Sequence, residues 1–197
     1  ISLALQADVI VVAAAGNERR NNNITPLYPA SFNQNNILSV AATTNRDVLA
    51  GYSNYGAGSV DLAAPGDAIL STWDSSDQSY QTTSGTSMSS PIVAGAAALM
   101  RAHFPVASAS EITARIIATT DPLPSLRGRC VSEGRLNLAL SLGPDLIAGF
   151  TMSPSGGAPP LQVSFEDHSL GEISNWFWDF GDGQSVSGLQ NPVHTYN

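Results

Sequence analysis

The stretch that decides the fold reads Gly85-Thr86-Ser87-Met88-Ser89-Ser90-Pro91, and it continues into Ile92-Val93-Ala94-Gly95-Ala96-Ala97-Ala98-Leu99. The second part is apolar and rich in small residues, which predicts a helix that packs closely inside a domain. Pro91 stands near the expected start of this helix, and Ser89 or Ser90 is available as its N-cap. The sequence therefore places Ser87 on a tight turn at the mouth of a helix, where a hydroxyl can be presented as a nucleophile.

Apolar runs before this turn predict the strands of a parallel sheet. Residues 9–15 form a continuous apolar run that ends in Gly16-Asn17, as expected for a strand buried on both faces. Residues 1–6 are expected to be the end of a helix that packs on this strand. Further short strands are predicted at residues 37–42, 60–63 and 69–73.

A second helix and a change of composition mark the end of the first domain. Ser108 and Glu111 have the spacing of a capping box, which predicts a helix that packs outside the sheet. Gly143-Pro144-Asp145 ends the helical pattern, and several prolines and glycines follow. We therefore predict an α/β domain over residues 1–142, a linker over residues 143–148 and a second module over residues 149–197.

The second module shows the alternation of antiparallel strands. Apolar residues alternate with polar ones in Leu161-Gln162-Val163-Ser164-Phe165 and again in Trp176-Phe177-Trp178-Asp179-Phe180. Gly181-Asp182-Gly183 follows the second run and predicts a hairpin turn. This pattern is typical of a β-sandwich, with Trp178 and Phe180 facing its core.

Composition excludes several classes of partner. The chain has 197 residues, with 8 basic residues, all of them Arg, against 16 acidic ones, and its net charge of -8 argues against a nucleic-acid partner. The longest apolar run is far shorter than a membrane-spanning helix requires, so no membrane span is expected. Cys130 is the single cysteine, which excludes an internal disulfide framework and a multi-cysteine metal site.

Several motifs in the first domain, taken in order, resemble the C-terminal part of the catalytic domain of subtilisin-like (subtilase) serine peptidases. They are Ala13-Ala14-Ala15-Gly16-Asn17-Glu18, Ala64-Pro65-Gly66, Gly85-Thr86-Ser87-Met88-Ser89-Ser90-Pro91, Val93-Ala94-Gly95 and Gly134-Arg135-Leu136-Asn137. The resemblance implies a three-layer parallel-sheet fold and an endopeptidase acting on peptides or proteins. It further implies that Ser87 is the nucleophile, that Asn17 is the oxyanion-hole amide, and that Ala14, Ala15 and Gly16 line a wall of the pocket for the residue before the scissile bond. Ile92 stands where the family has a non-catalytic His.

The base and its orienting acid are not found before Ser87. The family order is Asp, then His, then Ser, yet His103, His168 and His194 all follow Ser87. On a continuous helix His103 would lie about 24 Å from Ser87, at 1.5 Å per residue. We therefore expect the catalytic Asp and His to belong to a missing N-terminal part, and this fragment to be inactive by itself.

The second module resembles a PKD domain, an immunoglobulin-like β-sandwich, through its Trp178-Asp179-Phe180-Gly181-Asp182-Gly183 string and through Asn191-Pro192-Val193-His194-Thr195-Tyr196. The resemblance stops where the last strands of that family would begin, so we expect a truncated module. It implies an extracellular spacer or a binding domain for proteins or polysaccharides, and therefore a secreted or cell-surface protein. The alternative function is a non-catalytic adhesion or matrix-binding protein that uses this module.

The resemblance implies no organic cofactor. A structural Ca²⁺ around residues 29–36 is the one cofactor it suggests, because relatives often bind calcium through loop carbonyls and carboxylates. The spacing of Asp61, Asp67, Asp74 and Asp77 matches no dedicated calcium loop.

Overall fold

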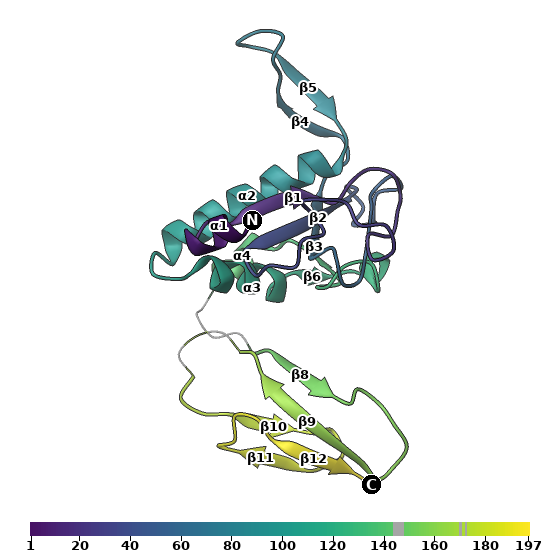
Figure 1. The fold of residues 1–197 in the computed structure, drawn as a ribbon, viewed down its shortest axis with the longest axis vertical. Helices are drawn as coiled ribbons and strands as arrows, with labels where there is room; N and C mark the ends of the chain where they lie inside the picture. Colours follow the sequence, from purple (N-terminus) through teal and green to yellow (C-terminus); the bar gives the residue numbers. More distant parts are fainter. Residues whose placement is uncertain (144–147, 170, 172) are drawn as a thin grey trace. The chain divides into compact units, whose positions relative to one another are not determined.

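A five-stranded sheet in the order β1-β2-β3-β7-β6 lies at the centre of the first part of the chain (Figure 1). Its strands are β1 (Val11–Ala14), β2 (Ile37–Thr43), β3 (Leu62–Pro65), β7 (Gly134–Arg135) and β6 (Asp121–Pro122). The pairs β1 with β2, β2 with β3 and β3 with β7 are parallel, whereas β6 is antiparallel to β7. The predicted parallel sheet is therefore confirmed, with the ends of β1, β2 and β3 shifted by at most two residues.

This computed structural model describes residues 1–143, 148–169, 171 and 173–197. The chain divides into two units, Ile1–Leu142 and Gly143–Asn197, and each is described by itself. Positions 144–147 of the expected linker lie outside the described residues.

Strand burial differs between the edge and the middle of the sheet. All seven residues of β2 are buried, as expected for a strand covered on both faces. In β1, only Ala13 is fully buried, because β1 is the last strand on its side of the described sheet. The expectation that β1 is buried on both faces was therefore wrong for the residues described.

The long helix α2 (Thr86–His103) begins earlier than the sequence suggested. Its N-cap is Gly85, so the prediction that Ser89 or Ser90 caps the helix was wrong, and Pro91 lies inside it. Ser89 is buried and instead donates a hydrogen bond to the carbonyl of Ala64 at 3.0 Å. The serine of interest, Ser87, consequently lies in the first helical turn.

Small residues let α2 lie directly on the sheet. Val93, Ala97 and Met100 are buried in one apolar cluster with Leu38 and Leu62 from the central strands. The opposite side of the helix is exposed, including Gly95. The predicted close packing therefore involves one face of α2.

The remaining helices are short. In α3 (Ala109–Ala118), the predicted capping box is confirmed, with Ser108 and Glu111 bonding to each other's backbone N–H. Ile112 and Ile116 of α3 join the apolar cluster of α2. The other helices are α1 (Ser2–Gln6), the 3-10 helix η1 (Pro124–Leu126) and α4 (Leu138–Ser141). Cys130 is a buried free thiol, and burial raises its pKa.

A hairpin of two short strands leads into α2. The strand expected at residues 69–73 is confirmed as β4 (Ile69–Thr72), but it pairs with β5 (Tyr80–Thr83), which the sequence did not predict. The pair forms its own two-stranded sheet, separate from the central one. Figure 1 shows the hairpin projecting from the body of the first unit beside the start of α2.

The second unit consists of two antiparallel sheets. One contains β8 (Phe150–Ser153), β9 (Leu161–Asp167) and β12 (Val193–Tyr196), and the other contains β10 (Phe177–Asp179) and β11 (Ser185–Ser187). The predicted hairpin at Gly181-Asp182-Gly183 is confirmed, because it joins β10 to β11. In the part of the chain that the structure describes, no helix has the length and apolar character needed to cross a bilayer.

Gly66 lies where the start of α2 meets the sheet, and the structure leaves no room there for a side chain. A β carbon on Gly66 would lie 2.7 Å from the β carbon of Ala42 and 2.9 Å from the carbonyl oxygen of Gly85, and it would also strike Ser89 Oγ. We expect Gly66→Ala to lower the free energy of unfolding by about 1–3 kcal/mol, since the added methyl overpacks this junction.

Gly95→Ala is the matched control. No atom lies within 4 Å of the β carbon it would add, so we expect it to raise the free energy of unfolding by about 0.5–1 kcal/mol through helix propensity. Urea unfolding followed by circular dichroism measures the free energy of unfolding of both variants. Equal effects of the two substitutions would contradict the claim that Gly66 fills a tight junction between α2 and the sheet.

Candidate active site

The serine turn sits where a helix offers unpaired donors. Ser87 is exposed and is the second residue of α2, so its backbone N–H has no partner within the helix. The positive end of the helix dipole lies at the same place. Pro91 has no N–H, so the helix lacks the bond that the Ser87 carbonyl would otherwise accept.

Thr86 joins the start of α2 to the loop that follows β1. Its backbone N–H donates to Oδ1 of Asn17 at 2.9 Å, and its hydroxyl donates to the same oxygen at 3.1 Å. The hydroxyl oxygen also accepts the N–H of Gly16 at 3.1 Å. Thr86 is fully buried, so its bond to the Gly16 N–H forms away from solvent, whereas Asn17 is an exposed residue.

This contact fixes the direction of the Asn17 amide. Because Oδ1 accepts from Thr86, the Nδ2 group points away from that bond and keeps its own hydrogens for another partner. A methyl group on Gly85 would lie 3.5 Å from Asn17 Nδ2 and 3.7 Å from the Ser87 backbone nitrogen. Two nitrogen donors from different elements therefore lie beside Gly85, where the predicted oxyanion hole would need them.

Buried asparagines that sequence reasoning missed hold the loop around and after Asn17. Asn54 Oδ1 accepts the N–H groups of Glu18 and Arg20 at 2.9 Å each. Its Nδ2 donates to Glu18 Oε2 at 3.0 Å and to Asn22 Oδ1 at 3.1 Å, and Asn22 Nδ2 donates to the Ala15 carbonyl at 2.9 Å. Asn22 and Asn54 belong to loop sequences in which asparagine is common, so no motif could have identified them as buried.

The three residues expected to line a pocket wall differ in exposure. Ala14 is half-buried, whereas Ala15 and Gly16 are buried. Ala15 packs in a second apolar cluster with Ala41 and Val60. Ala14 is thus the side chain of this set that reaches the surface, and Gly16 contributes the N–H that binds Thr86.

No histidine of the first unit lies near Ser87. His103 is at the far end of α2, which is continuous from Thr86, so the two side chains are separated by about 24 Å of helix. His168 and His194 belong to the second unit. Among the described residues of the first unit, Ser87 and the N–H groups predicted to bind an oxyanion come together without a histidine beside them.

A small cavity beside β2 is lined in part by side chains that carry oxygen atoms. The cavity has a volume of about 230 Å³, and Gln34 and Asp61 are among the residues that line it. Asp61 accepts the N–H of Ser39 at 2.7 Å, and burial raises the pKa of its carboxyl to about 6. The side-chain oxygens of Gln34 and Asn36 are buried without a hydrogen-bond partner. The described residues contain no group of three or more His, Cys, Asp or Glu that could hold a metal ion.

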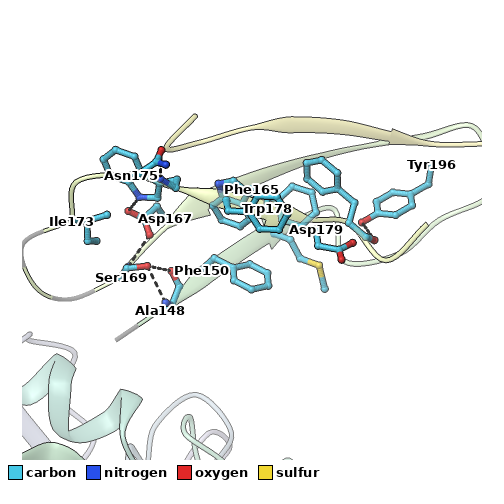
Figure 2. A pocket seen from close by; sticks show the side chains of 15 residues that line it. Ala148, Phe150, Phe165, Asp167, Ser169, Ile173, Asn175, Trp178, Asp179 and Tyr196 are labelled. Carbon is cyan, nitrogen blue, oxygen red and sulfur yellow. Dashed lines mark hydrogen bonds between the residues drawn. The ribbon is translucent and has the colours of Figure 1, made fainter. Parts of the chain in front are cut away.

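The second unit contains an open groove between its two sheets (Figure 2). The groove has a volume of about 620 Å³ and an aromatic floor, in which Trp178 lies 5.3 Å from Phe150 and 5.6 Å from Phe165 between ring centroids. At one end of the groove, Asp167 accepts the Trp176 indole N–H at 2.8 Å. Burial raises the pKa of Asp167, but hydrogen bonds from Ser169, Trp176 and Gln190 lower it more, to about 2.

Aromatic stacking confirms that the alternating residues of this unit face inward. Phe180 stacks on His194 at 4.1 Å between centroids, and His194 Nε2 bonds to Asp182 in the hairpin turn at 2.7 Å. These residues pack against one another, and the groove is lined mainly by aromatic and apolar side chains.

Comparison with known proteins identifies both units. A model of the subtilase family matches residues 1–150, and a PKD domain model matches residues 144–197. Thermitase from Thermoactinomyces vulgaris is 41% identical over 137 residues, covering 70% of this chain and 45% of that protein. An extracellular serine proteinase from a Thermus species is 39% identical over 119 residues, covering 60% of this chain and 28% of that protein.

Solved structures give the same result for the fold. A protease from Pseudoalteromonas arctica matches with a TM-score of 0.63 and 33% identity, covering 72% of this chain and 44% of its own. The prenylagaramide maturation protease matches with a TM-score of 0.62 and 25% identity, covering 72% of this chain and 52% of its own. The chain thus spans about half or less of the length of these relatives.

Titration of Asp61 predicts a pH dependence of stability in metal-free buffer. The folded pKa of about 6 lies above the ordinary value of 3.8, so near pH 5 the folded form holds a proton that the unfolded form has lost. Asp61 therefore makes its full contribution to the free energy of unfolding below pH 4. This contribution falls by up to about 3 kcal/mol as pH rises through 6. Asp61→Asn keeps an oxygen for the Ser39 N–H and should flatten the decline, as urea unfolding at several pH values would show. An unchanged slope in this variant would contradict the role of Asp61.

Proposed function

The chain belongs to the subtilase family, and from this premise we propose that it supplies the nucleophile and the oxyanion hole of a serine endopeptidase. Ser87 is the proposed nucleophile, and Asn17 Nδ2 with the Ser87 N–H are the proposed oxyanion donors. The observation that carries the proposal is the pair of hydrogen bonds that Thr86 donates to Asn17 Oδ1, because they leave Nδ2 free for another acceptor near the serine turn.

The proposed reaction is acyl transfer. Ser87 Oγ attacks the carbonyl carbon of a peptide bond, and the negative charge that develops on the carbonyl oxygen is met by two N–H groups and the positive end of α2. The amine leaves after accepting a proton, and water later releases the acyl group. The proton of Ser87 Oγ needs a base, and we propose that a His oriented by an Asp comes from polypeptide outside these residues, consistent with the family order.

Because the base is proposed to come from outside these residues, we expect that the chain by itself does not hydrolyse peptides. A serine hydroxyl is a poor nucleophile at neutral pH unless a base removes its proton. In the first unit the proposed donors are Asn17 Nδ2 and the Ser87 N–H, but His103 is too distant to act on Ser87. Ala14, Ala15 and Gly16 are proposed as the wall that binds the residue before the scissile bond, with the surface contributed mainly by Ala14.

The PKD module supports an alternative or additional function in binding. Its aromatic groove offers an apolar surface to an extracellular protein or a polysaccharide. A secreted or cell-surface location is proposed on the same grounds, and the relative from Thermus is itself named an extracellular proteinase. A purely adhesive protein would have no need of the Asn17 orientation, so the peptidase remains the leading proposal.

A structural calcium ion remains a proposal for the cavity beside β2. The Asp61 carboxylate and the unpartnered Gln34 oxygen are hard oxygen ligands of the kind that calcium prefers. Bound calcium would stabilise the loop over residues 29–36 without taking part in the reaction. Calcium chloride should raise the melting temperature of the parent chain more than that of Asp61→Asn, and an equal rise in both would rule out this site.

Labelling with a fluorophosphonate probe tests the peptidase proposal. The probe forms a bond between Ser87 Oγ and phosphorus, fluoride leaves, and the proton must pass to a base. We expect no labelling of the chain alone. We expect labelling when the chain is refolded with the N-terminal half of the thermitase catalytic domain, and none when the His of that half is replaced by Ala.

Two variants of this chain sharpen the result. Ser87→Ala should abolish labelling of the refolded pair. Asn17→Ala should slow it, and in subtilisin itself removal of the oxyanion-hole amide costs about 10²- to 10³-fold in kcat. Labelling of the isolated chain at Ser87, or a folded pair that stays unlabelled, would contradict the proposal.

A further inference from the structure

Tyr52 is a titratable side chain near the candidate site that the proposed reaction does not use. It lies in the loop between β2 and β3 and is half-buried. Its hydroxyl donates a hydrogen bond to the carbonyl of Gly66 at 2.8 Å. Burial raises the pKa of the Tyr52 phenol above its ordinary value of 10, and the charge of Asp67 raises it further, while the N–H of Gly85 offsets part of this rise. The hydroxyl therefore keeps its proton at neutral pH and remains a donor.

The carbonyl of Gly66 is the point at which Tyr52 meets the serine turn. The same oxygen accepts the N–H of Gly85 at 2.8 Å. A carbonyl oxygen has two lone pairs, so both donors can bind it at once. Gly85 is the N-cap of α2 and stands two residues before Ser87. The Tyr52 hydroxyl thus helps to fix the carbonyl that holds the start of the helix.

The main chain around Tyr52 is bound to the loop that carries Asn17. The carbonyl of Tyr52 accepts the N–H of Arg19 at 2.9 Å. Two residues further along, the N–H of Asn54 donates to the carbonyl of Gly16 at 2.8 Å. Gly16 and Arg19 stand on either side of Asn17 in the sequence. The loop of Tyr52 is therefore joined to the Asn17 loop on both sides of the proposed oxyanion-hole amide.

Two routes of hydrogen bonds consequently join the Asn17 loop to the serine turn. The first is direct and runs through Thr86. The second runs through the main chain and the phenol of Tyr52 to Gly66, and from there to Gly85. The two routes reach the serine turn at adjacent residues, so each supports the same geometry.

We propose that Tyr52 is a positioning residue that sets, through the Gly66 carbonyl, the spacing of the two proposed oxyanion donors. The inference rests on the proposed function, in which those donors are Asn17 Nδ2 and the Ser87 N–H. The Tyr52 hydroxyl is bound to Gly66 and takes no part in proton transfer. Removing only this hydroxyl should loosen the spacing of the donors while the ring keeps its packing.

Hydrogen exchange in the full chain tests the link itself. Tyr52→Phe keeps the ring but lacks the hydroxyl, and urea unfolding checks that the variant is folded. We expect the Gly85 amide to exchange about three- to tenfold faster in this variant, because its acceptor is held less firmly. The amide of Thr119, which donates to the Arg115 carbonyl at 3.1 Å at the end of α3, should exchange at the parent rate.

Fluorophosphonate labelling of the chain refolded with the N-terminal half of the thermitase catalytic domain tests the effect on reactivity. Rates at several probe concentrations give the maximum labelling rate and the apparent affinity separately. We expect Tyr52→Phe to lower the maximum rate about two- to fivefold and to leave the apparent affinity unchanged, because a positioning residue does not contact the probe. A residue needed for stability alone would leave both values unchanged in the folded fraction.

Tyr55→Phe is the matched control. Tyr55 lies in the same loop, and the guanidinium of Arg129 packs over its ring at 4.3 Å. Among the described residues, its hydroxyl has no hydrogen-bond partner. We expect Tyr55→Phe to label and to exchange at the parent rates, so a loss in Tyr52→Phe reports the bond to Gly66.

The double variant Tyr52→Phe with Thr86→Val tests whether the two routes join the same segments. Each single substitution leaves the other route in place. We therefore expect the fall in the maximum labelling rate of the double variant to exceed the product of the two single falls. Falls that simply multiply would contradict the proposal.

Three further results would overturn it: an unchanged maximum rate in Tyr52→Phe, a fall equal to that of Tyr55→Phe, or a change confined to the apparent affinity. If the parent pair is not labelled at all, the proposed reaction fails, and exchange at Gly85 still decides whether Tyr52 holds the turn. A labelled pair whose rate does not depend on Tyr52 would remove the positioning role and leave Ser87 and Asn17 in their proposed roles.

Discussion

The hydrogen bonds of Thr86 are the constraint on which the candidate site depends. One buried threonine receives the N–H of Gly16 and gives two hydrogen bonds to Asn17 Oδ1, so the loop after β1 and the first turn of α2 are fixed to each other. Thr86 thereby adds a direct link between the segments that carry Asn17 and Ser87. With it, the free amide of one and the backbone N–H of the other border the same space.

The sheet brings these segments together before Thr86 joins them. Parallel strands β1 and β3 end at the same edge, and binding sites of α/β sheets form outside the carboxyl ends of their strands. After β1 the chain runs to Asn17. After β3 it runs through Gly66, whose carbonyl receives the Gly85 N–H at 2.8 Å just before the serine turn. Buried Asn54 then holds the loop that would otherwise move Asn17.

Much of this could be predicted from the sequence. Continuous apolar runs predicted the parallel strands, and the Ser108 to Glu111 spacing predicted a capping box that the structure contains. The start of α2 could not be placed, because Ser89 and Ser90 before Pro91 have the pattern of an N-cap four or five residues too late, whereas Gly85 caps the helix. The hydrogen bonds of Asn54 could not be predicted, because they depend on which loops lie next to each other in the folded protein. The β5 strand was missed because its sequence, Tyr80-Gln81-Thr82-Thr83, has no apolar core pattern and pairs only with β4.

Amide hydrogen exchange in a Thr86→Val variant tests the Thr86 contact most directly. Valine matches the shape of threonine but cannot accept the Gly16 N–H. The account predicts that exchange at Gly16 becomes at least about tenfold faster, which corresponds to the loss of one buried hydrogen bond. Exchange at Ala15, whose N–H bonds to the Val40 carbonyl at 3.0 Å, should stay at its parent rate. Unchanged exchange at Gly16 would contradict the claim that Thr86 holds the two halves of the site together.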